Sequence, residues 1–308
     1  MSWDIIGDVH GEADALERLL EAMGYVEVDG AYRHEGGRRV VFLGDFIDRG
    51  PEQLRVIEIA RRMMERSGAL AVMGNHEFNA VGFATPDPEA PGAWMRPRIA
   101  KNVRQHRVFL EQVGGAEGAL HRELVGWFKA LPLWLDLGEL RVVHACWHPR
   151  EMEVARAHVD ARGCLREAAW VPAFRRGEAL YEALEAILKG VEMALPPGVT
   201  FADKEGHVRK RVRVAWWRSG EQTVREAALL DDATRAKLPT TPLALETIYT
   251  EEVPVFIGHY WLRGEPRPLA PNVACVDYSV AKGGHLVAYR WDGEALREEG
   301  FARVAAQG

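Results

Sequence analysis

Two carboxylates and an arginine stand within five residues of one another in the stretch 44–51. They are Asp45, Asp48 and Arg49, and they follow the apolar run 40–43, which predicts a buried strand. Charged side chains at the end of a buried strand are costly unless they are paired or bound to metal. A carboxylate in this place is suited to bridging two cations. We therefore expect Asp45 to be the shared ligand of a two-metal site that acts on phosphate esters.

Polar side chains able to bind metal also follow four other short apolar runs, at 5–6, 69–73, 141–143 and 253–257. In α/β sheets, side chains just beyond the carboxyl ends of the strands converge on one crevice. The candidate metal ligands are Asp8, His10, Asp45, Asn75, His144 and His259. This set has oxygen and imidazole donors and no thiolate, so it suits manganese, iron, zinc or nickel.

Three side chains near these ligands have chemistry suited to a phosphate substrate. Arg49 offers a planar fork of donors that matches phosphate oxygens. His76 directly follows Asn75 and, with Asp48 as its carboxylate partner, would stay protonated and act as general acid toward the leaving oxygen. Two divalent ions at the site would clamp an in-line displacement and lower the pKa of bound water.

The elements between these residues predict an α/β domain. Apolar residues at helical spacing predict helices at 12–23, 54–66, 101–134 (broken at Gly114-Gly115) and 178–188. Later strands are expected at 273–276 and 286–291, and Asp292-Gly293 predicts a hairpin turn into a last strand near 295–297. The polar stretch around residues 29–37 is expected to be a turn. Because 145–252 holds no further motif of this quality, we expect a cap-like insertion there within a single domain of residues 1–308.

Composition places the chain among ordinary globular proteins, with 47% hydrophobic and 27% charged residues in 308. The net charge of −6 argues against broad nucleic-acid binding. Three widely spaced cysteines argue against a disulfide framework, and we expect them to be packed as small hydrophobic residues. We find no signal-peptide pattern and no apolar run near the ~18 residues that a membrane span requires. These features favour a cytoplasmic protein without a membrane partner.

Three motifs resemble the signature of the calcineurin-like metallophosphoesterases. They are Gly-Asp-Val-His-Gly at 7–11, Gly-Asp-Phe-Ile-Asp-Arg-Gly at 44–50 and Gly-Asn-His-Glu at 74–77, in that order and about 35 and 30 residues apart. They are most similar to the phosphoprotein-phosphatase branch, which includes bacterial Ser/Thr phosphatases and diadenosine tetraphosphate hydrolases. The resemblance is close over residues 4–80 and implies a four-layer α/β/β/α sandwich, here with a mostly helical insertion over the site.

The resemblance also implies roles for individual residues. The first metal ion would be bound by Asp8, His10 and Asp45. The second would be bound by Asp45, Asn75, His144 and His259. Arg49 would hold the phosphate, with Asn75 and Arg218 as further substrate contacts, and His76 with Asp48 would form the acid pair. The implied reaction is direct hydrolysis by a metal-bridging hydroxide, with two divalent ions, manganese first among them and iron, zinc or nickel as alternatives.

Several positions depart from the family pattern. The family usually has His-Gly-Gly or His-Ala-Gly where this sequence has His144-Ala145-Cys146, so Cys146 stands in place of a glycine, with Trp147 after it. His148 competes with His144 for the ligand role. We favour core or rim packing over a base-stacking role for Trp147, Tyr260 and Trp261. The basic stretch 204–218 is interpreted first as a solvated strand and second as a polyanion-facing wall that holds Arg218. Structural roles are expected for Asp277, Tyr278 and Lys282.

The leading hypothesis is a binuclear metal-dependent hydrolase of phosphate esters or anhydrides. Its substrate would be a phosphorylated small molecule, a nucleotide or a phosphoprotein. A Ser/Thr phosphatase, a diadenosine tetraphosphate hydrolase and a nucleic-acid end phosphatase share this chemistry. A negative protein with a large insertion favours a compact anion among them. The non-enzymatic alternative is a metal-binding interaction module, and the sequence does not predict an oligomeric state.

Overall fold

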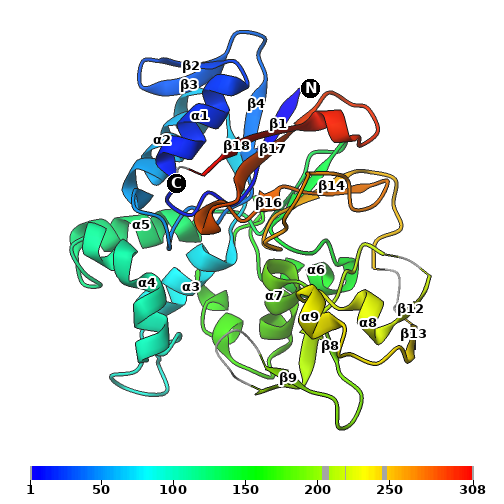
Figure 1. Ribbon diagram of the computed structural model, residues 1–308. Helices are drawn as coiled ribbons and strands as arrows, with labels where there is room; N and C mark the ends of the chain where they lie inside the picture. Colours follow the sequence, from blue (N-terminus) through cyan, green and yellow to red (C-terminus); the bar gives the residue numbers. More distant parts are fainter. Residues whose placement is uncertain (1, 203–207, 219, 245–247, 307–308) are drawn as a thin grey trace.

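Two β-sheets lie face to face at the centre of the molecule, with helices on the outside (Figure 1). The computed structural model describes residues 2–202, 208–218, 220–244 and 248–306. The larger sheet has the order β16 (Asp277–Tyr278), β17 (His285–Trp291), β1 (Trp3–Ile6), β4 (Arg39–Phe42) and β5 (Leu70–Ala71), with β18 (Phe301–Ala305) also paired to β17. The smaller has the order β15 (Val273–Cys275), β14 (Val255–Ile257), β7 (Arg141–Val143) and β6 (Trp134–Asp136).

Successive side chains of the central strands are buried in two different cores. Ile5 and Val41 of the larger sheet share one buried cluster with Val142 of the smaller sheet. Their neighbours Ile6 and Phe42 belong instead to the cluster that contains the helices. Because side chains alternate across a strand, this division means that each sheet is covered on both faces. The α/β fold class and the layered sandwich predicted from the sequence are confirmed.

The outer layers are amphipathic helices. On the side of the larger sheet, α1 (Ala13–Ala22) and α2 (Gln53–Arg66) each bury one apolar face in the core that holds the outward side of that sheet. The opposite layer contains α6 (Pro149–Arg156) and α7 (Ala179–Lys189), which pack side by side (Figure 1). The backbone N–H groups of Ala145 and Cys146 donate to the carbonyl of Ile187, so α7 is joined to the chain leaving β7. Three further helices, α3 (Asn75–Ala84), α4 (Ala100–Gln112) and α5 (Ala119–Lys129), follow β5.

The predicted insertion at 145–252 is helical up to Lys189 and rich in short strands after it. In the described part of this region the strands form three antiparallel pairs. These elements are β8 (Glu192–Ala194), β9 (Phe201–Ala202), β10 (Val208–Arg209), β11 (Arg211–Arg213), β12 (Glu221–Thr223) and β13 (Pro242–Ala244), with α8 (Val224–Ala227) and α9 (Asp232–Arg235) between them. Trp216 connects the region to the loop after β14, because its Nε1 donates to the Tyr260 hydroxyl as well as to the carbonyl oxygen of Ala145. The described helices include none long and apolar enough to cross a membrane.

The structure adds one element to the predictions and contradicts another. The predicted turn at Asp29-Gly30 is present, with both residues at positive φ, and it joins β2 (Tyr25–Val28) and β3 (Ala31–His34) in a hairpin that was not predicted. The strand expected near 295–297 is wrong. The chain pairs with β17 only from Phe301, because the loop after β17 is held by a bond from Trp291 Nε1 to the Glu294 carbonyl.

Candidate metal centre

The six predicted metal ligands lie at the carboxyl ends of five strands from both sheets. They are Asp8 and His10 after β1, Asp45 after β4, Asn75 after β5, His144 after β7 and His259 after β14. The strands β1, β4 and β5 run parallel in one sheet, and β7 and β14 run parallel in the other. Parallel strands end at the same edge, so the structure brings together side chains that are up to 251 residues apart in the chain.

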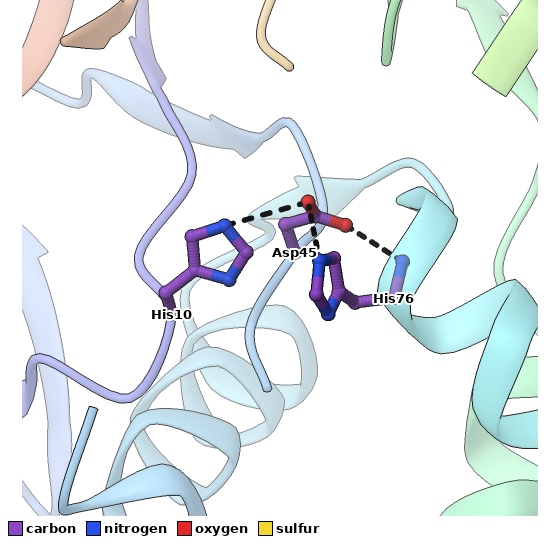
Figure 2. Close-up of side chains that lie close together, drawn as sticks. All are labelled: His10, Asp45 and His76. Atoms are coloured by element: carbon purple, nitrogen blue, oxygen red, sulfur yellow. Dashed lines mark hydrogen bonds and ion pairs between the residues drawn. The ribbon is translucent and has the colours of Figure 1, made fainter. Parts of the chain in front are cut away.

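Asp45 lies at the centre of this cluster. Its Oδ2 is 3.6 Å from His10 Nε2 and 3.5 Å from His144 Nε2, and its Oδ1 accepts a 2.9 Å hydrogen bond from the backbone N–H of His76. Figure 2 shows the His10 and His76 rings directed toward this carboxylate. Two groups have donor atoms within 4.8 Å of one another, namely His10, Asp45, His76 and Asp45, His144, His259. Asp45 belongs to both, as a bridging ligand would.

The imidazoles of the cluster are held through one nitrogen and present the other. His10 Nδ1 donates to the Ile47 carbonyl at 2.9 Å, and His144 Nδ1 donates to the Leu43 carbonyl at 2.7 Å. The Nε2 atoms of His10 and His259 are buried without a hydrogen-bond partner in the described structure. Metal-binding histidines are typically oriented in this way by a carbonyl or carboxylate.

His144 gives the clearest sign that a cation belongs here. Burial is the main factor that lowers its pKa, so the ring is neutral, and Nε2 then carries a lone pair because Nδ1 holds the proton. That lone pair faces two acceptor oxygens, Asn75 Oδ1 at 3.1 Å and Asp45 Oδ2 at 3.5 Å. Three electron-rich atoms converging in a buried site are unfavourable unless a cation lies between them. The donor set therefore fits a divalent metal.

The charges of the centre lead to the same conclusion. Burial lowers the pKa of His10 to about 3, which keeps the imidazole neutral and able to ligate. Burial, followed by the negative charges of Asp277 and Asp45, raises the pKa of Asp8 well above its usual value. The Asp8 carboxylate accepts the His259 backbone N–H at 3.1 Å, and it lies outside the two three-residue groups. Bound cations would relieve the repulsion among these buried carboxylates.

Glu77 orders the backbone around Asp45, a role that the sequence did not reveal. Its buried carboxylate accepts the backbone N–H groups of Asp45 at 2.8 Å, Phe46 at 2.9 Å and Gly74 at 3.0 Å. Burial, then the charge of Asp45, raises the pKa of Glu77 to about 8. Gly74 is needed for this close approach, since a Cβ there would lie 2.2 Å from Asp45 Oδ1. The position of Glu77 at the end of the third motif was the only available signal.

Residues with a left-handed backbone conformation are concentrated around the metal centre. Among the described residues, non-glycine positions with positive φ are His10, Asp29, Asp45, Asp48, Arg49, His259, Trp261 and Ser279. Most of these belong to loops of the metal centre. Left-handed backbone at such residues is costly and is retained mainly where function requires it.

The predicted contact between His76 and Asp48 is present, and His106 joins it as a third residue. His76 Nδ1 lies 2.5 Å from Asp48 Oδ2, and the other oxygen of Asp48 lies 2.7 Å from His106 Nδ1. All three side chains are buried. Burial alone would lower the pKa of His76, but Asp45 and Asp48 raise it above its usual value. His106 lies on α4, in a stretch whose pattern indicated only a helix.

The structure does not bring Arg218 to the cluster. Its exposed guanidinium donates to the Glu226 carbonyl at 2.7 Å. Arg213 of β11 is the arginine of this stretch that acts on the centre, because its charge helps to lower the pKa values of both His144 and His259. Its Nε is buried without a hydrogen-bond partner in the described part of the chain. Residues 203–207 of the predicted basic stretch lie outside the described residues.

The aromatic residues that depart from the family pattern have different surroundings. Trp147 is buried against Arg141, whose Cζ lies 4.9 Å from the ring centre, and the Tyr260 hydroxyl donates to the Ala145 carbonyl at 2.9 Å. Both pack as expected. Trp261 is different, because its ring stacks on His10 with the ring centres 5.3 Å apart.

The positions of His148 and of the cysteines can be compared with the predictions. His148 is the residue immediately before α6, whereas His144 faces Asp45. The three cysteines are free and buried, as predicted.

Comparisons with known proteins agree with this geometry. A model of the calcineurin-like phosphoesterase family matches residues 1–167. Curated relatives named bis(5'-nucleosyl)-tetraphosphatase PrpE [asymmetrical] are 46% identical over 76 residues in Halalkalibacterium halodurans (25% of this chain, 31% of the relative) and 45% identical over 147 residues in Geobacillus thermodenitrificans (47% and 57%). The chain thus spans from about a third to about half the length of these relatives.

One solved structure supports the fold over the whole chain. The crystal structure of a proposed diadenosine tetraphosphatase aligns with 99% of this chain and 94% of its own, with a TM-score of 0.50 and 16% identity. The family match ends at residue 167, so His259 is the one predicted ligand that is placed beside the others by the three-dimensional structure alone.

Proposed function

The chain belongs to the calcineurin-like phosphoesterase family, and on this premise we propose that it hydrolyses phosphate esters or anhydrides with two divalent metal ions, manganese first among them. The observation that carries the proposal is Asp45, which belongs to both groups of buried donors, one with His10 and His76 and the other with His144 and His259. The bound metals would supply a water of lowered pKa and polarise a phosphate oxygen. We also propose one domain over residues 1–308, capped by 145–252. The free cysteines suit a reducing compartment, and we propose a cytoplasmic location.

Each group of side chains has a separate task in this proposal. One metal would be held by Asp8, His10 and Asp45, and the other by Asp45, Asn75, His144 and His259. Arg49 and Arg213 hold phosphate oxygens, with Asn75 beside them. His76 donates a proton from Nε2 to the leaving oxygen, while Asp48 accepts from Nδ1 and keeps the ring oriented. His76 Nε2 lies 4.0 Å from Asp45 Oδ2, which directs it toward the metals.

Nucleotides are the proposed substrate class, since the curated relatives carry the name bis(5'-nucleosyl)-tetraphosphatase. The test is a panel with the manganese-loaded protein: p-nitrophenyl phosphate, its bis-ester, diadenosine tetraphosphate and a phosphothreonine peptide. We expect hydrolysis of diadenosine tetraphosphate and of p-nitrophenyl phosphate. Preference for the peptide would favour the protein-phosphatase alternative. No hydrolysis with manganese, iron, zinc or nickel would reject the proposal.

Arg213 and Arg218 form a matched pair for testing phosphate binding. We expect Arg213→Gln to raise KM for p-nitrophenyl phosphate by about tenfold, because a charge-assisted hydrogen bond to phosphate is lost. Arg218→Gln removes an equal charge at an exposed position bonded to Glu226 and serves as the control. Steady-state kinetics of both variants provide the measurement. A larger effect at Arg218 would reverse the assignment.

His106 is expected to position Asp48 and, through it, the acid. His106→Leu should lower kcat about tenfold for phenyl phosphate and less for p-nitrophenyl phosphate, whose better leaving group needs less protonation. His106→Asn retains a donor near the Nδ1 position and should restore part of the loss. His121→Leu is the control, because that buried ring lies beside His106, with centres 6.4 Å apart. Equal losses for both esters would assign His106 a purely structural role.

A further inference from the structure

Trp261 lies at the edge of the metal centre with two cations against its ring. Arg49 Cζ is 4.3 Å and Lys282 Nζ is 3.8 Å from the centre of the indole. The two cationic groups are therefore separated by no more than the sum of these distances. Both side chains are exposed, and cation–π contact with one partly buried ring holds them near each other despite their repulsion. The same ring stacks on His10, which joins the pair of cations to the metal centre.

A single buried carboxylate anchors both parts of this arrangement. Asp277 Oδ2 accepts the Trp261 backbone N–H at 2.6 Å, and its Oδ1 accepts the Ser279 backbone N–H at 3.0 Å. Ser279 starts the short 3₁₀ turn that carries Lys282. Asp277 thus fixes the loop of the tryptophan and the turn of the lysine relative to each other.

The anchored residues are held in a costly conformation. Trp261 has φ 53° and Ser279 has φ 61°, in the left-handed region that bulky residues rarely occupy. Such a conformation persists where the surrounding structure imposes it, most often at functional sites. Simple rim packing of Trp261 would not require this backbone strain.

We propose that Trp261, Arg49 and Lys282 form a second phosphate-binding position, which selects substrates with two or more linked phosphates. The inference rests on the proposed function, because it places the first phosphate at the metals and Arg49. An adjoining phosphate would then lie between Arg49 and Lys282 and offset their repulsion. A phosphomonoester or a phosphopeptide supplies one phosphate and leaves Lys282 without an anionic partner from the substrate. The ligand class is therefore a nucleoside polyphosphate, with the diphosphate as its simplest member.

AMP and ADP provide a probe pair that differs by one phosphate. Their dissociation constants are measured by calorimetry at a fixed free manganese concentration, in a His76→Asn background that slows turnover. We expect ADP to bind at least about tenfold more tightly than AMP. Lys282→Met, which keeps the aliphatic stem, should reduce this preference by about tenfold, and Trp261→Leu should reduce it in the same direction.

Arg303→Gln is the matched control, because it removes an exposed cation of β18 that is paired with Glu265. It should retain the preference for ADP. An unchanged preference in Lys282→Met, or equal binding of AMP and ADP by the parent protein, would overturn the second position. Since binding is measured as a dissociation constant in a background with slowed turnover, this result is independent of the substrate panel. Failure of hydrolysis alone would reject the proposed function instead.

Discussion

Asp45→Asn is expected to lower kcat/KM for p-nitrophenyl phosphate by about three orders of magnitude. Asparagine keeps the shape of the side chain but removes the charge that both donor groups share. Loss of a supporting residue around a metal already costs about 10–100-fold in affinity, so loss of the bridging ligand should cost more. Metal content after dialysis and steady-state kinetics measure the two effects.

Thermal unfolding separates loss of metal from loss of fold. Manganese should stabilise the parent protein by about 2.7 kcal/mol when its concentration is 100 times the dissociation constant. The Asp45→Asn variant should unfold cooperatively but gain little from added manganese. Asp160→Asn is the control, because Asp160 lies in a loop where it pairs with Arg162. Unchanged metal content and activity in Asp45→Asn would refute the bridging role.

His76→Asn is expected to lower kcat by about 10²–10⁴-fold for phenyl phosphate, since a general acid contributes on this scale. The loss should be much smaller for p-nitrophenyl phosphate, whose leaving oxygen needs little protonation. Metal content should be retained, because the proposal gives His76 no ligand role. Measuring kcat for both esters with the metal-saturated variant tests this. A loss of bound metal together with equal losses for both esters would make His76 a ligand.

The dependence of kcat on pH tests whether Asp48 raises the pKa of His76. Burial lowers the pKa of His76, whereas Asp45 and Asp48 raise it, and the net pKa is above the usual value. If the protonated ring is the acid, kcat should fall as pH rises through this elevated pKa. Asp48→Asn removes one of the raising interactions, so the alkaline fall should move to lower pH. If kcat of Asp48→Asn decreases at the same alkaline pH as in the parent protein, His76 is not the group whose titration causes the decrease.

Local sequence determined the parts of the molecule that depend on near neighbours. An apolar strand followed by a glycine and a metal-capable side chain requires only a few adjacent residues, and the motifs at 7–11, 44–50 and 74–77 have this form. Amphipathic spacing likewise predicted α1, α2 and α7 close to their observed bounds. The fold class followed from the same local patterns, because strands alternating with helices favour a layered α/β structure.

Only the tertiary structure decided which distant side chains act together. Three hydrogen-bonded pairs join residues that are 32, 58 and 16 positions apart, namely Glu77 with Asp45, His106 with Asp48, and Asp277 with Trp261. Such pairs produce no periodic pattern in the sequence from which they could be predicted. The choice of Arg213 over Arg218 depends on which of them faces the sandwich, which is a matter of docking between elements. The last strand was misplaced for the same reason, because its register is set by pairing with β17 and by the Trp291 loop.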